Sequence, residues 1–125
     1  MAEMGFWLLI AAINGLLAVA LGAFGAHGLE GRLSAKDLAT FETAVRYHMY
    51  HALALGLCAF ASHGADIQQV TAAGSLFTLG IILFSGSLYL YSVRNWRPLV
   101  YVTPFGGLAF LAGWVMLALA ACHLG

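Results

Sequence analysis

Four long apolar stretches constrain this chain more than any other feature of its sequence. They cover approximately residues 5–26, 47–62, 70–92 and 99–122. An α-helix needs ~20 apolar residues to cross a ~30 Å hydrocarbon core, and only the second stretch falls short of that length. Because lipid offers no partner to backbone N–H and C=O groups, the spans must be helices. The sequence therefore predicts an all-α bundle of four transmembrane helices.

The composition supports a lipid environment. Of the 125 residues, 62% are hydrophobic and only 8% are charged, whereas soluble domains carry roughly a quarter charged residues. The mean hydropathy is +0.91. Five basic residues balance five acidic ones, which leaves no basic patch for nucleic acid. We expect one integral membrane domain over residues 1–125, with the lipid bilayer as a partner and no nucleic acid.

The short second stretch has an amphipathic helical start in front of it. Ser34 and Asp37 have the spacing of a helix N-cap, and apolar residues then recur at helical intervals, at Leu38, Phe41, Val45 and Met49. A single helix that begins at Ser34 and enters the membrane near Tyr47 is the expected result.

The basic residues orient the predicted bundle. They fall only between the first two spans and between the last two, at Arg32, Lys36, Arg46, Arg94 and Arg97. In a four-span protein these two segments share a side, which the positive-inside rule makes cytoplasmic. Both termini and the "HGADIQQ" link should then face outside. The membrane should be a cell inner (plasma) membrane, although the sequence leaves a mitochondrial one open.

Small residues on two spans predict close helix contacts. Gly15 and Gly22 lie on one face of the first span, and Gly106 and Gly113 on one face of the fourth. Helices in lipid associate through such faces. One small bundle does not need so many of them, so we expect a homo-oligomer or a larger membrane complex that Gly22→Leu or Gly113→Leu would weaken.

The stretch "AVRYHMYHALAL" holds the main candidate ligand site. His48 and His51 are three residues apart and share a helix face, which we expect at the inner membrane interface. His27 should approach from the end of the first span, and Tyr89 from the third at a similar depth. Three imidazoles could bind zinc or copper, and one could ligate haem. Neutral histidines bonded to carbonyl or hydroxyl groups, and a proton or quinone-headgroup site, are the other interpretations.

Polar groups deeper in the spans should face protein. The third span carries hydroxyls at seven-residue intervals, at Thr71, Thr78, Ser85 and Ser92, which we expect opposite the histidine face of the second. They would either join helices or bond their own backbone, with a solute or proton path as the alternative. The indole N–H of Trp114 should also find a partner inside the bundle.

Four segments carry a resemblance to a known family. They are "LGAFGAHGL" (21–29), "FETAVRYHMYHALAL" (41–55), "FSGSLYLYS" (84–92) and "TPFGGLAFLAGW" (103–114). In order and over nearly the whole chain, they resemble the YgdD-like family of small uncharacterised membrane proteins, which has a eukaryotic transmembrane-protein branch. The resemblance implies a four-helix integral membrane protein and brings no established activity with it.

The sequence favours a protein without catalysis. The acidic residues lie at the edges of the predicted membrane, so no nucleophile–His–acid arrangement can form inside it. We expect a self-associating protein or an accessory subunit that is not an enzyme and needs no cofactor. The alternative is a metal, haem or quinone binder, or a minimal transporter, that uses the histidines.

Overall fold

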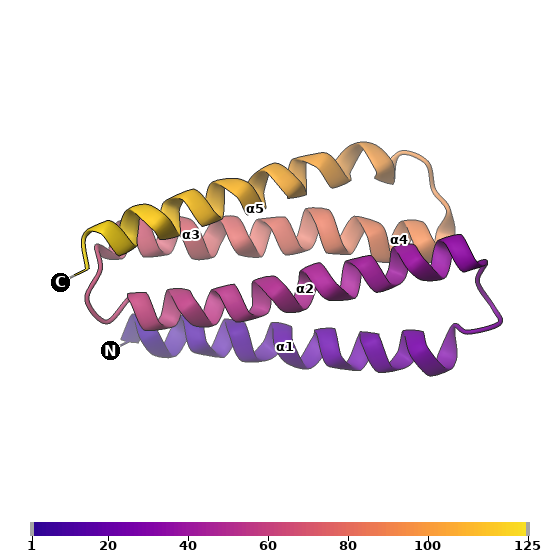
Figure 1. The fold of residues 1–125 in the computed structure, drawn as a ribbon, viewed down its shortest axis with the longest axis horizontal. Helices are drawn as coiled ribbons and strands as arrows, with labels where there is room; N and C mark the ends of the chain where they lie inside the picture. The colour runs from indigo at the N-terminus through magenta and orange to yellow at the C-terminus, as the bar shows by residue number, and fades with distance from the viewer. Residues whose placement is uncertain (1, 125) are drawn as a thin grey trace.

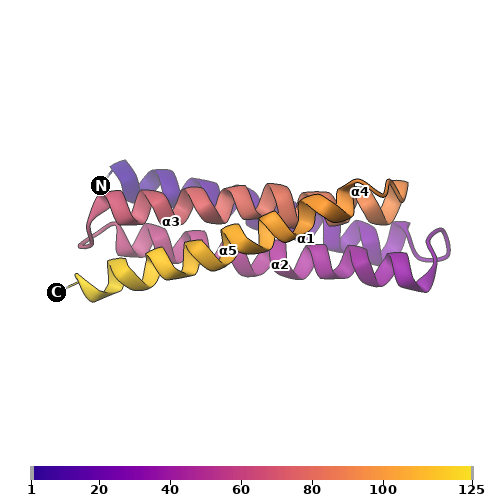
Figure 2. The same cartoon turned by 90° about the horizontal axis from the view of Figure 1, so that it is seen from above.

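The computed structural model is a bundle of long helices (Figures 1 and 2). It describes residues 2–124, so Met1 and Gly125, which the single-domain prediction includes, lie outside the described residues. The helical elements are α1 (Ala2–Gly28), α2 (Ala35–Ala61), α3 (Ile67–Gly80), the π-helical turn η1 (Ile81–Ser85), α4 (Gly86–Arg94) and α5 (Leu99–Cys122).

The elements α3, η1 and α4 follow one another without a break and form one rod of 28 residues, Ile67–Arg94. The bundle therefore has four rods, and the all-α prediction is confirmed. Three of the rods, namely α1, α3–η1–α4 and α5, are long and apolar enough to cross a membrane. The exception is α2, whose first third is polar and charged.

The start of α2 follows the predicted cap. The backbone N–H of Asp37 donates to Ser34 Oγ at 3.1 Å, which gives one of the unpaired N–H groups of the first turn an acceptor. The helix then continues for 27 residues to Ala61. This length places the second predicted span, residues 47–62, in the second half of a helix as long as α1.

α2 occupies the centre of the bundle. It packs against α1 on one side and against α3, η1, α4 and α5 on the other, whereas α1 packs chiefly on α2 (Figure 1). The buried residues of α2 include two imidazoles, and they run from Phe41 to Ala61. The face of α2 that packs on the other helices does not need a lipid-compatible surface, which explains how α2 tolerates two imidazoles there.

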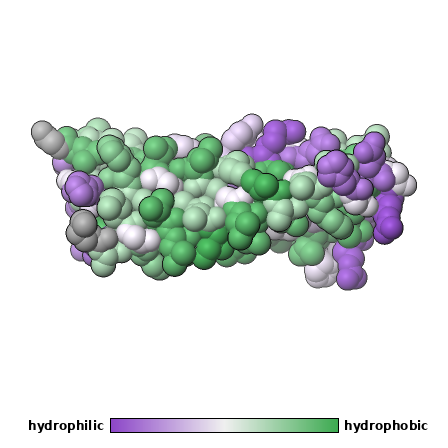
Figure 3. Space-filling model, turned by 90° about the horizontal axis from the view of Figure 1, so that it is seen from below, coloured by the Kyte–Doolittle hydropathy of each residue, from purple (hydrophilic) through white to green (hydrophobic). Residues whose placement is uncertain are grey.

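The polar residues gather at one end of the bundle. Both described chain ends and link 62–66 lie at one end, and links 29–34 and 95–98 lie at the other (Figure 1). Hydrophilic side chains gather mostly at the end that holds links 29–34 and 95–98, and apolar side chains cover most of the remaining face (Figure 3). The two segments that carry all the basic residues therefore share one end.

Three of the four predicted packing glycines make close contacts within the chain. A Cβ on Gly22 would lie 3.1 Å from Val45 Cγ1, and one on Gly113 would lie 2.7 Å from the Phe77 ring. Gly106 lets α5 approach the backbone of η1, because a Cβ there would overlap Leu83 and Phe84.

The fourth predicted packing glycine, Gly15, makes no close contact inside the described bundle, since a Cβ there would meet no atom within 4 Å. Gly22 and Gly113 are occupied by contacts inside the bundle. Substituting Leu at either would also press on these contacts, and the expectation that Gly22→Leu or Gly113→Leu weakens a larger complex stays a prediction.

We expect Gly106→Ala to destabilise the bundle, because the neighbour that would have to move is helix backbone rather than a flexible side chain. Overpacking of this kind costs about 1–3 kcal/mol of the free energy of unfolding. Gly107→Ala is the matched control, since its Cβ would make an ordinary 3.9 Å contact with Phe84. Thermal unfolding in mild detergent, followed by circular dichroism, measures both. Equal stability of the two variants would contradict the close contact.

Candidate functional site

The two imidazoles of α2 lie deep in the bundle. His48 is the midpoint of α2, and both His48 and His51 are only 4% exposed. The helix begins thirteen residues before His48, which places the imidazole at the middle of its length. The expected position at the inner membrane interface stays a prediction. Buried polar side chains at this depth need partners from neighbouring helices.

His48 joins three helices through hydrogen bonds. Its Nε2 lies 3.0 Å from Asn14 Oδ1 on α1, and its Nδ1 lies 2.9 Å from the Tyr89 hydroxyl on α4. Asn14 Nδ2 donates to the carbonyl of Ile10 at 2.9 Å, which assigns Oδ1 as the acceptor. His48 must then carry its proton on Nε2, and Tyr89 must donate its hydroxyl proton to Nδ1.

His51 makes a second set of contacts, toward α5. Trp114 Nε1–H donates to His51 Nε2 at 3.1 Å, so this nitrogen is the acceptor and Nδ1 carries the proton. That proton goes to the carbonyl of Tyr47, 2.7 Å away. The ring also stacks on Phe110 with centroids 3.5 Å apart. The expectation that the Trp114 indole finds a partner inside the bundle is confirmed.

These bonds occupy the nitrogen lone pairs that a metal would need. A neutral imidazole has one lone pair, and here His48 Nδ1 accepts from Tyr89 while His51 Nε2 accepts from Trp114. A metal or haem iron could bind either ring only after one of these interhelical bonds had broken. The "HxxH" spacing thus supplies hydrogen bonds between helices in this fold.

His27 does not join the other two histidines. It is exposed near the end of α1, thirteen residues beyond the Asn14 that bonds His48, which is about 20 Å along a helix. Within residues 2–124, no group of three His, Cys, Asp or Glu residues could hold a metal ion. The structure therefore brings together His48 and Tyr89, and it leaves His27 apart from them.

The predicted hydroxyl seam meets α2 at one point. Ser85 Oγ donates to the carbonyl of Ala44 at 2.9 Å, and both residues are buried. Thr78 and Ser92 instead bond carbonyls of their own helix. The seven-residue spacing assumes a regular helix, whereas η1 contains a π turn in which Gly86 N–H donates to Ile81 O, five residues back.

Sequence reasoning missed Asn14, although a signal was present. Asn14 is the single amide or charged side chain in the apolar stretch 5–26. An isolated polar residue in such a stretch marks a site that faces protein rather than lipid. Its partner His48 could not be identified without the pairing of α1 with α2.

A cavity of about 570 Å³ opens beside this group of polar side chains. Its walls come from α1, η1, α4 and α5, and they include Leu17, Leu21, Ile82 and Leu90. Asn14, His48 and Tyr89 also line it. A mostly apolar cavity with a few convergent polar groups has the form of a small-molecule site.

Comparison with known proteins identifies the family. The model of "Protein of unknown function (DUF423)" matches residues 21–107. The UPF0382 membrane protein YwdK of Bacillus subtilis is 52% identical over 119 residues, which cover 94% of this chain and 97% of that protein. This chain belongs to the DUF423/UPF0382 family of small membrane proteins.

Other members show the same extent of similarity. The UPF0382 inner membrane protein YgdD of Escherichia coli K12 is 41% identical, over 95% of this chain and 91% of YgdD. SH2409 of Staphylococcus haemolyticus is 44% identical over 94% of this chain and 95% of its own. The YgdD-like resemblance is confirmed, and the chain is a multi-pass protein of the cytoplasmic (inner) membrane. No solved structure matches it.

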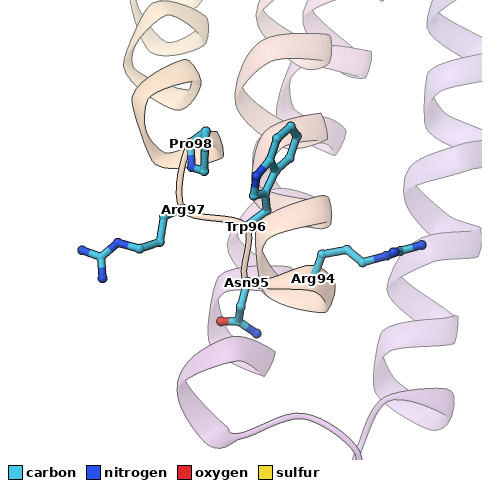
Figure 4. Close-up of a pocket in the computed structure, with 5 residues that line it drawn as sticks. All are labelled: Arg94, Asn95, Trp96, Arg97 and Pro98. Atoms are coloured by element: carbon cyan, nitrogen blue, oxygen red, sulfur yellow. The ribbon is translucent and has the colours of Figure 1, made fainter.

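A second cavity, of about 540 Å³, lies at the link between α4 and α5 (Figure 4). Asn95, at a positive φ of 52°, reverses the chain, and its Nδ2 donates to Asp37 Oδ2 at 3.3 Å. Arg94 and Arg97 point to opposite sides (Figure 4), so their guanidinium groups do not converge on one anion.

We expect the two buried histidines of this family member to hold opposite neutral tautomers, with the proton on Nε2 in His48 and on Nδ1 in His51. The donors Trp114 N–H and Tyr89 O–H enforce this difference. Side-chain ¹⁵N chemical shifts of histidine-labelled protein in nanodiscs measure it, with His48→Gln and His51→Gln assigning the signals. The same tautomer in both rings would contradict the hydrogen-bond assignment.

Proposed function

We propose that this protein is a non-catalytic, single-domain membrane protein that acts by association within the bilayer, with itself or as an accessory subunit. The main support for this proposal is that the links between the helices are short, at residues 29–34, 62–66 and 95–98. Almost all of the described surface belongs to the helices. A partner would therefore be contacted mainly in the plane of the membrane.

The chemistry of the buried side chains supports the absence of catalysis and of a resident metal or haem. Each buried imidazole has both ring nitrogens engaged by protein groups. Cys58 is a free cysteine buried in the apolar core cluster, which is typical of an unreactive structural cysteine. These contacts favour structural roles for the polar groups over metal or haem ligation.

We further propose that α2 is a fourth span and that both termini face outside. The three apolar rods and α2 have similar lengths, and each rod runs antiparallel to the one before it in the chain. The links therefore alternate between the two ends of the bundle (Figure 1). The amphipathic start of α2 shares its end with the basic links, where charged side chains can reach the headgroups. The proposed cytoplasmic side is therefore the end of Arg32 and Arg97.

The native cysteine tests the orientation. Cys122 is exposed at the end of α5 and should react with a membrane-impermeant maleimide added to intact spheroplasts. In a Cys122→Ala background, Glu30→Cys in the first link should react only after permeabilisation. Glu30 is the better probe position because replacing it leaves the basic residues in place. Labelling of Cys122 only after permeabilisation would overturn the orientation.

Counting copies tests association. We expect photobleaching of singly labelled protein in nanodiscs, and native mass spectrometry from mild detergent, to give a fixed number of copies above one or a stoichiometric partner retained through purification. Elemental analysis and visible absorbance of the same sample should detect no stoichiometric metal or haem. Monomers without a partner in both measurements would contradict the association, and a stoichiometric metal would contradict the assignment of the histidines.

A further inference from the structure

One stripe of α1 borders two neighbouring cavities. The cavity of about 570 Å³ beside His48 and a second one of about 370 Å³ share Ile82 as a lining residue. Along α1 they are lined in turn by Phe6, Ile10, Asn14, Leu17 and Leu21. Phe6 and Leu21 are fifteen residues apart, so this α1 groove extends for about 22 Å.

The α1 groove is lined mostly by apolar side chains, and its main polar groups lie in the wider cavity. The described residues that line the two cavities include no Asp, Glu, Lys or Arg. Where the wider cavity reaches Asn14 and Tyr89, hydrogen-bonding capacity remains unused. One N–H of Asn14 Nδ2 donates to the Ile10 carbonyl and the second remains available. The Tyr89 hydroxyl donates its proton to His48 Nδ1, and its oxygen can still accept a hydrogen bond.

These features select the chemistry of an occupant. A charged head would lose its hydration in the α1 groove without gaining a counter-charge, so the occupant's head is neutral. A carbonyl oxygen can accept the spare Asn14 N–H proton, and a hydroxyl can also donate to Tyr89. Asn14 lies next to the midpoint of α1, about 20 Å along the axis from each end of that helix. The narrower cavity can then hold an apolar hydrocarbon chain attached to that head.

We propose that the α1 groove binds a prenyl-chain quinone or its quinol. The ring occupies the wider cavity, with one oxygen bonded to Asn14, and the chain follows α1 past Ile10 toward Phe6. His48 holds both Asn14 and Tyr89 in position without touching the ring's oxygen itself. This binding does not depend on whether the protein forms oligomers.

Tryptophan fluorescence tests the proposal, because Trp7 lines the narrower cavity and quinones quench indole fluorescence. Trp7 is two helical turns from Asn14, about 10 Å, within reach of a bound quinone. The probe is decylubiquinone, titrated into protein in phosphatidylcholine nanodiscs. We expect saturable quenching that Trp7→Phe removes. Quenching that rises linearly with quinone, as partition into lipid alone would give, overturns the proposal.

Two variants locate the site. Asn14→Leu should raise the Kd about tenfold, the equivalent of one hydrogen bond of about 1.4 kcal/mol. Leu17→Phe should fill the wider cavity without replacing any polar side chain and weaken binding at least as much. Leu53→Phe is its matched control, since Leu53 is exposed on α2 and does not line the groove.

If Asn14→Leu fails to fold, Leu17→Phe decides the outcome. An unchanged Kd in Leu17→Phe overturns the site. Occupation by a second copy would instead give disulfide-linked dimers of Leu17→Cys in a Cys122→Ala background, and occupation by a phospholipid would leave a tightly bound lipid that decylubiquinone does not displace. Either result also overturns the proposal.

Discussion

The fold depends on giving the polar groups of α2 partners inside the bundle. In lipid, burying apolar side chains between helices gains little, because hydrocarbon tails are equally apolar. Hydrogen bonds and close packing must hold the helices together instead. α2 supplies the bonds: His48 connects it to α1 and α4, His51 connects it to α5, and the Ala44 carbonyl accepts from Ser85 of η1. Each of the other rods is thus tied to the central one.

Close packing complements these bonds at positions where a side chain is missing. Gly106 brings α5 against the backbone of η1, and Gly74 and Gly80 make room for the rings of Trp7 and Phe110. Phe110 in turn stacks on His51, so the same aromatic side chain fills a glycine gap and covers an imidazole. The glycine contacts and the interhelical hydrogen bonds therefore meet at Phe110, which touches both Gly80 and His51.

The histidine pair illustrates how context assigns a role to a motif. Two imidazoles one helical turn apart can face a common ligand, so the spacing alone is compatible with a metal site. In the bundle the rings diverge, because His48 turns toward α1 and α4 while His51 turns toward Trp114. The lone pair of each ring accepts a hydrogen bond from a different helix, α4 for His48 and α5 for His51. The group beside the open cavity is consequently Asn14 with Tyr89, held by His48, rather than a pair of imidazoles.

The sequence by itself determined the all-α architecture, the positions of the four rods, the cap at Ser34 and the gathering of basic residues in two links, since these depend on local hydropathy, helical periodicity and side-chain chemistry. It also indicated that the Trp114 indole needs a partner. The depth of His48, the separation of His27, the role of Asn14 and the freedom of Gly15 were decided only by tertiary structure. Each depends on how far along its axis one helix pairs with another, and apolar stretches of similar length leave that register open. The π turn of η1 lies where Gly106 of α5 approaches the rod, and no distinct pattern in the residues themselves predicts it.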